Sequence, residues 1–316
     1  MLFFRPGLAD GGADRVTLTL LESLDRARVA PSIALVKASG ALVGDVPADV
    51  EVIDLRASRL ASAAPALARA IARTRPDVVF STASAANVVA VAAHTLARSR
   101  AMLILSERSA IFRDERSALR TAVELRLKRL AYRRADLVTA VSEGVARDLE
   151  QHLGVPRAKL RVVYNPMVAD DLERLAAAPI DHPWFRDPQT KMIVACGRLV
   201  EVKDYPTMLD AFARLREART NVKLAVLGDG PLRGSLEREA KARGLADHVA
   251  FLFFDKNPYK YMARARLLLQ SSRAEGLPGT LIQAMACGTP VVATDCDHGP
   301  REVVTSGTDG VLVPVG

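Results

Sequence analysis

Short apolar runs rich in β-branched residues alternate along the whole chain with longer Ala-, Leu- and Arg-rich segments of helical period. This alternation constrains the fold strongly, because strands separated by helices pair in parallel rather than as hairpins. It predicts an α/β fold. In the first half we expect strands at residues 2–4, 32–36, 50–55, 77–81, 102–106, 137–141 and 160–164. In the second half we expect them at residues 191–196, 222–227, 249–253, 267–270, 290–294 and 310–313.

The segment "YNPMVADDLERLAAAPIDHPWFRDPQT" between the two sets is rich in Pro and Asp and poor in strand formers. Such composition is typical of a domain boundary, which we place near Asn165 and Pro166. The predicted domains are therefore residues 1–165 and 166–316. A length of 316 residues fits two domains, since one domain takes about 150.

Composition excludes several classes of protein. No apolar run approaches the roughly 18 residues of a membrane span, and the N-terminus shows no basic region followed by an apolar core, so we expect neither a membrane-spanning nor a secreted protein. Cys196, Cys287 and Cys296 form no Cys-x-x-Cys pair and have no Cys or His partner at zinc-ligand spacing, which favours a reducing cytosol without a zinc site. The net charge of +8 favours an anionic partner, with an ordinary basic surface as the alternative.

Three Gly-rich turns follow strands in the second half. Because the carboxyl ends of parallel strands meet at one edge of a sheet, these turns are expected to share a ligand site. "GRLVEVKDYP" adds two cations before a helix, an arrangement suited to a diphosphate. Each turn alone could be a plain solvated loop. The residues concerned are Gly197, Arg198 and Lys203, then Gly228 and Gly230, then Glu275, Gly276 and Gly279.

The first half opens with a strand, a Gly-rich loop and a helix in "LFFRPGLADGGADRV". Gly11 and Gly12 would let a phosphate or a sugar hydroxyl approach the backbone N–H groups of the helix N-terminus, although a plain turn is an equal alternative. The loop lacks the Gly-x-Gly-x-x-Gly spacing of dinucleotide-binding proteins.

Several distinctive segments occur in order along the chain: "GGADRV", "VSEGVARDL", "VVYNPM", "GRLVEVKDYPTML", "LGDGPLR", "SSRAEGLPGTLIQAMACGTPVVATD", "GPREVV" and "GVLVPVG". The run from Glu-Gly-Leu-Pro to Gly-x-Pro-Val-Val in the sixth segment is hard to obtain by chance. On these segments nearly the whole chain resembles the retaining glycosyltransferases of family 4, most strongly from Gly197 onward. The resemblance implies the GT-B fold of two facing Rossmann-like domains with an interdomain cleft. It also implies transfer of a sugar from a nucleotide diphosphate sugar, UDP-sugars being favoured, to an acceptor hydroxyl with retention of configuration.

The resemblance assigns residues on the donor side. Arg198 and Lys203 match the pair that neutralises the donor diphosphate, and Glu275 matches the first acid of the family's Glu-x7-Glu motif. The second acid is replaced by Gln283, which keeps one carbonyl acceptor for the ribose but loses the charge. The turn expected at the donor phosphates consists of Gly276, Leu277, Pro278 and Gly279.

Two further positions depart from the family. The family usually has a glycine near the position of Phe253, in the turn that meets the nucleobase. Glu107 and Arg108 replace a frequent His and resemble the Ser-Glu-Arg variant of enzymes that add amino sugars to lipid-linked acceptors. They are acceptor-side candidates, with a surface salt bridge as the alternative. We interpret His94 and His298 as structural rather than catalytic.

No metal or other cofactor is expected. Asp295 and Asp297 imitate a metal-binding Asp-x-Asp motif, but Arg198 and Lys203 already supply positive charge for a diphosphate. Two rival functions remain: a nucleotide-sugar 2-epimerase of the same fold, and a basic membrane- or nucleic-acid-binding protein without catalysis. The chain has 5% aromatic residues and lacks a nucleic-acid module, so a nucleic-acid partner is not expected.

A basic helix is predicted between Arg116 and Arg134, with seven basic residues and one acid, Glu124. Its stripe of Leu119, Val123, Leu127 and Ala131 either packs on the sheet or, with the charges, contacts an anionic membrane. We expect a cytoplasmic enzyme, peripheral at the inner face of the membrane, that glycosylates a lipid-linked or cell-envelope glycan. Because relatives continue beyond "VLVPVG", we also expect the C-terminal domain to be truncated.

Overall fold

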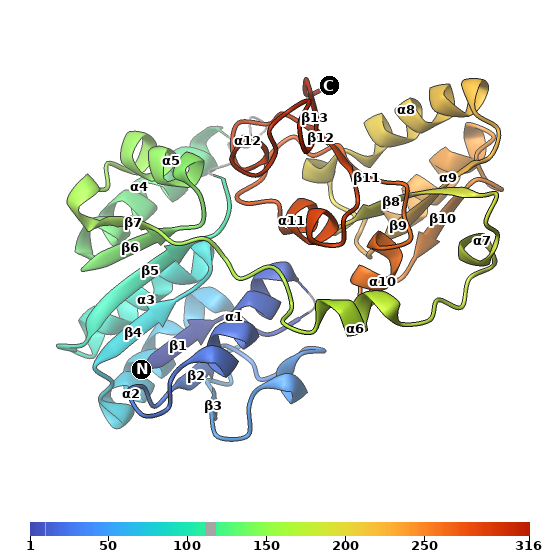
Figure 1. Cartoon of the computed structure of the whole chain (residues 1–316). Coiled ribbons are helices and arrows are strands. Elements are labelled where there is room, and N and C mark those ends of the chain that lie inside the picture. Colours follow the sequence, from blue (N-terminus) through green and yellow to red (C-terminus); the bar gives the residue numbers. More distant parts are fainter. Residues whose placement is uncertain (10, 111–117) are drawn as a thin grey trace. The chain divides into compact units, whose positions relative to one another are not determined.

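The computed structural model describes residues 1–9, 11–110 and 118–316. The chain divides into two compact units, Met1–Pro166 and Met167–Gly316 (Figure 1). The division falls in the segment that lacks strand formers.

Unit 1 holds a seven-stranded parallel sheet of order β3-β2-β1-β4-β5-β6-β7. The order reverses on either side of β1, which is the Rossmann arrangement. Its strands are β1 (Leu2–Arg5), β2 (Ser32–Leu35), β3 (Glu51–Asp54), β4 (Val78–Ser81), β5 (Met102–Glu107), β6 (Leu137–Ala140) and β7 (Leu160–Val162).

The helices of unit 1 connect these strands and cover the sheet (Figure 1). Their ends follow local chemistry. The helix α5, for example, begins after Ser142, whose side chain accepts a hydrogen bond from the Val145 N–H, and ends at Gly154 in the left-handed conformation. The helices are α1 (Gly12–Ser23), α2 (Ala64–Thr74), α3 (Ser84–Leu96), α4 (Ala118–Arg134) and α5 (Glu143–Leu153), with short 3-10 turns at Val43–Asp45, Leu60–Ser62 and Arg157–Lys159.

Unit 2 repeats the arrangement with a six-stranded parallel sheet of order β10-β9-β8-β11-β12-β13. The strands are β8 (Lys191–Cys196), β9 (Val222–Leu227), β10 (Val249–Leu252), β11 (Leu267–Gln270), β12 (Val291–Thr294) and β13 (Gly310–Val313). The helices are α6 (Leu172–Ala177), α7 (Pro183–Arg186), α8 (Tyr205–Ala218), α9 (Arg233–Ala242), α10 (Tyr259–Met262), α11 (Gly279–Ala286) and α12 (Pro300–Val303), with a 3-10 turn at Glu201–Lys203.

Each unit has its own hydrophobic core. In unit 1, Phe3, Leu21 and Ile33 pack in one buried cluster, and in unit 2 Phe212 and Leu224 belong to another. The central strands are buried on both faces, so polar groups that could meet a ligand are expected at the strand ends and in the loops that follow them. All thirteen strands that the sequence predicts are present, with small shifts at their ends.

The sequence allows two alternatives for the apolar stripe of α4, and one of them is that the stripe packs on the sheet. Ala131 is buried, but Val123 and Leu127 are exposed. The packing interpretation is therefore wrong for these two residues. Arg116 lies outside the described residues, and the side chains of Leu119 and Arg120 are not described. Within the described part of the chain, no helix is both long and apolar enough to span a membrane.

Candidate functional site in unit 2 and candidate acceptor residues in unit 1

The carboxyl edge of the unit 2 sheet brings a lysine and a glutamate into contact. Lys203 Nζ, on the loop after β8, lies 2.5 Å from Glu275 Oε1, on the loop after β11. Ser272 Oγ donates to the same carboxylate oxygen at 2.6 Å. The Glu275 side chain is only 10% exposed, so the ion pair is screened less than a surface pair would be.

The two loops are joined by buried hydrogen bonds. Ser271 Oγ bonds to the backbone oxygens of both Lys203 and Asp204 at 2.8 Å. The Asp204 carboxylate is buried at the start of α8 and accepts from Thr207 Oγ1 at 3.0 Å and from Arg273 Nε at 2.9 Å. These contacts fix Lys203 and Glu275 on one rigid edge.

The charge of Glu275 affects its neighbours. Burial and then Glu275 raise the pKa of the Cys296 thiol to about 11. Burial, Cys196 and Glu275 raise the pKa of Tyr205, whose hydroxyl donates to Gly197 O at 3.0 Å. Both groups therefore stay neutral at physiological pH, and neither competes with Glu275 as an anion. Glu275 Oε2 accepts no hydrogen bond from any described residue, so it is available to a ligand.

Arg198 stands on the same loop as Lys203 and is exposed. Its guanidinium makes no hydrogen bond or ion pair with the described residues, whereas the Lys203 ammonium is engaged by Glu275. The edge thus offers one uncompensated cation beside a paired one. Charge-assisted hydrogen bonds to an anion are open to Arg198 without breaking any existing contact.

The glycines after β8 and β9 have packing reasons of their own. A Cβ atom on Gly228 (φ +139) would lie 2.1 Å from Gly197 O, and one on Gly230 would lie 2.5 Å from Leu199 O. The two loops touch backbone to backbone, which only glycine permits. A Cβ on Gly197 would meet Tyr205 Oη at 3.3 Å. Their presence in the sequence therefore does not require a ligand, and their donor-binding role stays a prediction.

The Gly276–Gly279 turn is packed against residues from other segments of unit 2. Gly276, Leu277 and Pro278 are buried. A Cβ on Gly299, which follows β12, would lie 2.6 Å from Pro278 Cδ and 3.0 Å from Gly276 O. Gly279 begins α11, where an added Cβ would lie 2.6 Å from Met167 Sδ. The turn is therefore tightly enclosed by protein on these sides.

Gln283 on α11 contacts the first residues of unit 2. Its Nε2 donates to Met167 O at 3.0 Å and lies 3.3 Å from the Tyr259 hydroxyl. That hydroxyl donates to Met167 O at 2.9 Å and accepts from the Ala169 N–H at 3.1 Å. The amide nitrogen is thus used within the protein, while the Gln283 carbonyl oxygen makes no hydrogen bond with a described residue. A ribose contact stays a prediction for that oxygen.

Phe253 follows β10 at the same edge and is 68% exposed. Its ring stacks on the guanidinium of Arg233, with Cζ 3.9 Å from the ring centroid. The Arg233 Nη2 also donates to Phe251 O at 2.5 Å, which fixes the cation beneath the ring. The aromatic face therefore stands out at this edge rather than filling the core.

In unit 1, Glu107 is buried, with 1% exposure. Tyr132 Oη donates to Glu107 Oε2 at 2.6 Å, and Ser109 Oγ donates to Oε1 at 3.1 Å. Asn87 Nδ2 in turn donates to Tyr132 Oη at 2.7 Å. Burial and Glu107 together raise the pKa of Tyr132. Glu107 forms no salt bridge with a described residue, so a surface salt bridge is the wrong explanation for it.

The Arg108 side chain reaches the first turn of α1. Its Nη1 donates to Ala13 O at 2.9 Å. Burial and the nearby Arg5, which is ion-paired with Asp14, lower the pKa of Arg108 to about 9. Gly12 is open, with nothing within 4 Å of an added Cβ. The structure thus brings Arg108 to Ala13, next to the Gly11–Gly12 loop, whereas the Glu107 carboxylate is bonded to Tyr132 and Ser109.

Sequence reasoning missed Ser272, Asp204 and Arg273 around Glu275, and Tyr132 beside Glu107. The pair Ser271–Ser272 directly after a buried strand was a usable signal, because polar residues at a parallel strand's carboxyl end face the ligand edge. The contacts of Asp204 and Tyr132 had no local signal, since their partners lie far away in the sequence.

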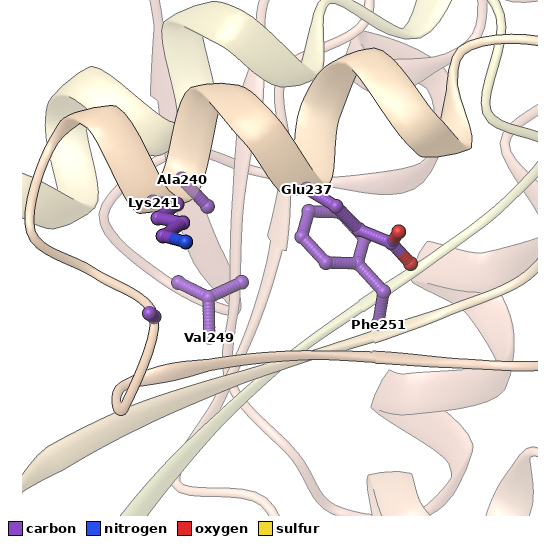
Figure 2. Close-up of a pocket in the computed structure, with 6 residues that line it drawn as sticks. Glu237, Ala240, Lys241, Val249 and Phe251 are labelled. Carbon is purple, nitrogen blue, oxygen red and sulfur yellow. The ribbon is translucent and has the colours of Figure 1, made fainter.

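A separate hollow of about 310 Å³ lies between α9 and β10, lined by Glu237, Ala240, Lys241, Ala246, Val249 and Phe251 (Figure 2). It contains none of the expected site residues. Its one acid and one ammonium do not converge with other polar groups, so we assign it no role. Across residues 1–9, 11–110 and 118–316, no group of three or more His, Cys, Asp or Glu residues could hold a metal ion.

Comparison with known families decides the class. Residues 10–170, just over half of the 316, match the family described as Glycosyltransferase Family 4, and residues 180–316 match Glycosyl transferases group 1. The chain belongs to glycosyltransferase family 4.

Known relatives and structures agree with this family. The N-acetylgalactosamine-N,N'-diacetylbacillosaminyl-diphospho-undecaprenol 4-alpha-N-acetylgalactosaminyltransferase of Campylobacter jejuni is 36% identical over 59% of this chain and 48% of its own length. The lipopolysaccharide core biosynthesis glycosyltransferase LpsE of Rhizobium meliloti is 30% identical over 60% of this chain and 52% of its own length. The match thus spans about half the length of these curated relatives.

The fold is shared with solved structures. Anabaena Alr3699/HepE in complex with UDP and glucose superposes with a TM-score of 0.81 at 24% identity, covering 99% of this chain and 85% of the other. The same protein in complex with UDP gives 0.76 at 25% identity, covering 100% and 85%. WaaG, a glycosyltransferase involved in lipopolysaccharide biosynthesis, gives 0.77 at 17% identity, covering 99% and 85%. The GT-B class, with two Rossmann-like parallel-sheet domains, is confirmed.

Proposed function

We propose that the protein transfers a sugar from a nucleotide diphosphate sugar to a hydroxyl of a lipid-linked or cell-envelope glycan, with retention at the anomeric carbon. The observation that carries the proposal is the Lys203–Glu275 contact beside the exposed Arg198 at the carboxyl edge of unit 2. Two cations and one carboxylate there match a reaction in which a diphosphate leaves and positive charge develops on the sugar.

Each side chain has a defined part in the proposed reaction. Arg198 and Lys203 bind the diphosphate and stabilise it as the bond between the anomeric carbon and the phosphate oxygen breaks. Glu275 accepts hydrogen bonds from sugar hydroxyls through Oε2 and offsets the positive charge at the anomeric carbon. The acceptor oxygen forms the new bond on the same face, and its proton passes to the departing phosphate oxygen. The products are the glycoside and the nucleoside diphosphate.

The donor side is assigned to unit 2 and the acceptor side to unit 1. Gln283 offers its carbonyl oxygen to the ribose, and the Gly276–Gly279 turn lines the phosphates. Arg108 and the Gly11–Gly12 loop are the polar groups of unit 1 that we place at the substrates. Glu107 acts at a distance, by holding Tyr132. Because two cations already offset the diphosphate charge, we propose that no metal is needed.

The nucleotide and acceptor classes rest on the relatives. The Anabaena protein was solved with UDP, which supports a UDP-sugar donor. The Campylobacter jejuni relative is named for a diphospho-undecaprenol acceptor and the Rhizobium meliloti relative for the lipopolysaccharide core, which supports an envelope glycan. We accordingly propose action in the cytoplasm, at the inner face of the membrane.

Calorimetry with UDP-, GDP- and ADP-sugars tests the donor assignment. We expect a UDP-sugar to bind, with the same affinity in the presence of EDTA. Replacing both Arg198 and Lys203 by Ala should weaken binding by at least about 2 kcal/mol, because a hydrogen bond to a charged group contributes about 1.5–3 kcal/mol. A double variant of the exposed cations Arg219 and Arg238 is the matched control. Equal affinity in the Arg198 and Lys203 variant would remove the diphosphate assignment.

A further inference from the structure

The helix α4 leaves three of its large apolar side chains exposed, unlike other helices of unit 1. The helix α2 buries Leu67 and Ile71, and α5 buries Leu149. On α4 the exposed fractions of Val123, Leu127 and Leu130 are 53%, 51% and 55%. Exposed apolar side chains that form a contiguous patch commonly mark an interaction surface.

The rotation of α4 about its own axis explains the exposure. Tyr132 is fully buried, with its hydroxyl fixed between Glu107 and Asn87, and Ala131 is buried beside it. Val123, Leu127 and Leu130 are spaced by four and three residues, so they share one face of the helix. At 3.6 residues per turn, this face lies away from Tyr132. The buried polar contact therefore holds the apolar stripe outward.

Three arginines lie on or beside the same face. Arg126 and Arg134 lie four residues before and after Leu130, and Arg133 follows Leu130 by three residues. All three are exposed, and their guanidinium groups have no hydrogen bond or ion pair within the described chain. The other two cations are engaged. Lys128 Nζ pairs with Glu124 Oε1 at 2.9 Å, and Arg129 Nε donates to His152 O at 2.8 Å.

We propose that this face of α4, formed by Val123, Arg126, Leu127, Leu130, Arg133 and Arg134, docks on the surface of an anionic lipid bilayer. Aliphatic side chains enter the boundary between headgroups and acyl chains, while the long arginine side chains reach lipid phosphates. The charge on the face is of one sign, because the single acid of the helix is paired with Lys128. A bilayer rich in anionic lipid matches both the apolar and the cationic components.

The strength of membrane binding can be estimated from the basic and aliphatic side chains of the α4 face. Each basic residue near an anionic surface contributes about 1 kcal/mol, or about fivefold in partitioning. Three arginines and three partly inserted aliphatic side chains give reversible, salt-sensitive binding rather than permanent insertion. Binding itself is independent of the proposed catalysis. Only its purpose, bringing the donor site to a lipid-linked acceptor, rests on the proposed function.

Sedimentation with phosphatidylcholine vesicles, with and without phosphatidylglycerol, tests the proposal on the full chain. The parent protein should sediment only with the anionic vesicles and should be released by high salt. Arg126→Glu with Arg133→Glu should reduce partitioning at least about 25-fold, since two contributions of fivefold are lost. Leu127→Gln with Leu130→Gln should reduce it at least about tenfold without changing the net charge.

Arg219→Glu with Arg238→Glu is the matched control, because it changes the net charge equally on exposed residues of unit 2 and should leave sedimentation at the parent level. Circular dichroism checks that each variant folds, and calorimetry with the nucleotide sugar in the absence of vesicles should give parent affinity for all of them. The proposal is overturned if the parent stays in the supernatant at low salt, or if both α4 variants sediment like the parent. Loss of nucleotide-sugar binding with intact sedimentation would instead count against the proposed function alone.

Discussion

Glu107 and Glu275 are both largely buried carboxylates at the carboxyl edge of a parallel sheet, yet their surroundings differ. Glu275 is compensated by the Lys203 ammonium and keeps one oxygen without a partner in the described chain. Among the residues that the structure describes, Glu107 has no cation partner and uses both oxygens on hydroxyl and backbone donors, above all the Tyr132 hydroxyl. An acid with an available oxygen beside a cation can act on a ligand. An acid with both oxygens occupied by neutral donors holds the structure together.

The largest expected effect comes from Glu275→Gln. If the charge acts at the transition state, turnover should fall about 10²–10³-fold, the loss typical for one preorganised electrostatic contact, while donor affinity changes little. Steady-state kinetics and calorimetry on the same preparation measure both quantities. The exposed Glu217→Gln provides the matched control. If Glu275→Gln turned over at the parent rate, the Glu275 charge would have no role in the reaction, and the contrast with Glu107 would fail.

Tyr132→Phe tests the structural role of Glu107. It removes the donor that satisfies Glu107 Oε2, leaving a buried oxygen without its partner, which costs about 1–3 kcal/mol. The free energy of unfolding of unit 1 should fall by that amount in a urea titration. Turnover per folded molecule should stay at the parent level. A loss of turnover at unchanged stability would place Glu107 and Tyr132 among the groups that face substrate.

Gln283→Glu adds a carboxylate to those of Glu107 and Glu275. This variant tests whether unit 2 tolerates a carboxylate that has no cation partner. The amide donor to Met167 O is lost and a negative charge faces that carbonyl oxygen, so we expect unit 2 to be destabilised by about 1 kcal/mol, a typical hydrogen-bond contribution. Thermal melting measures the change. Gln283→Met, which removes the amide without adding charge, separates the two causes. Stabilisation by Glu would mean that the Tyr259 hydroxyl replaces the amide as donor.

The smallest expected effect is that of Ser272→Ala. Ser272 shares Glu275 Oε1 with Lys203, so its loss should cost about 0.5 kcal/mol, the lower end of the net value of one hydrogen bond, and lower turnover about two- to threefold. Kinetics beside Ser235→Ala, an exposed serine on α9, tests this. An effect as large as that of Glu275→Gln would show that Ser272 itself contacts substrate.

The strands and the donor-side loops could be predicted from the sequence because their signals are local. Alternating apolar and helical segments fix the strands, and Gly-rich turns after strands fix the edge where Lys203 and Glu275 meet. The same reasoning could not distinguish a glycine needed by a ligand from Gly228, which is needed by the carbonyl of Gly197. Both give the same sequence pattern.

The orientation of α4 could not be predicted because it depends on a long-range contact. The recurrence of Val123 and Leu127 predicts one face, but which face turns inward depends on the hydroxyl of Tyr132 reaching Glu107, on β5. Likewise, a glutamate directly after a strand looks the same in sequence whether its partner is a lysine or a tyrosine. The orientation of α4 and the roles of the two glutamates depend on which residues they contact, and these residues lie far away in the sequence.

The place of Met167 has a practical consequence for anyone who wishes to produce the donor-binding half by itself. Its carbonyl oxygen receives hydrogen bonds from Tyr259 and Gln283, and its sulfur occupies the space above Gly279. A protein that began a few residues after Met167 would lack the side chain that packs against the start of α11. The Tyr259 hydroxyl and the Gln283 amide would also lose their shared acceptor, the Met167 carbonyl oxygen. A recombinant unit 2 should therefore begin upstream of Met167, with at least Pro166 retained.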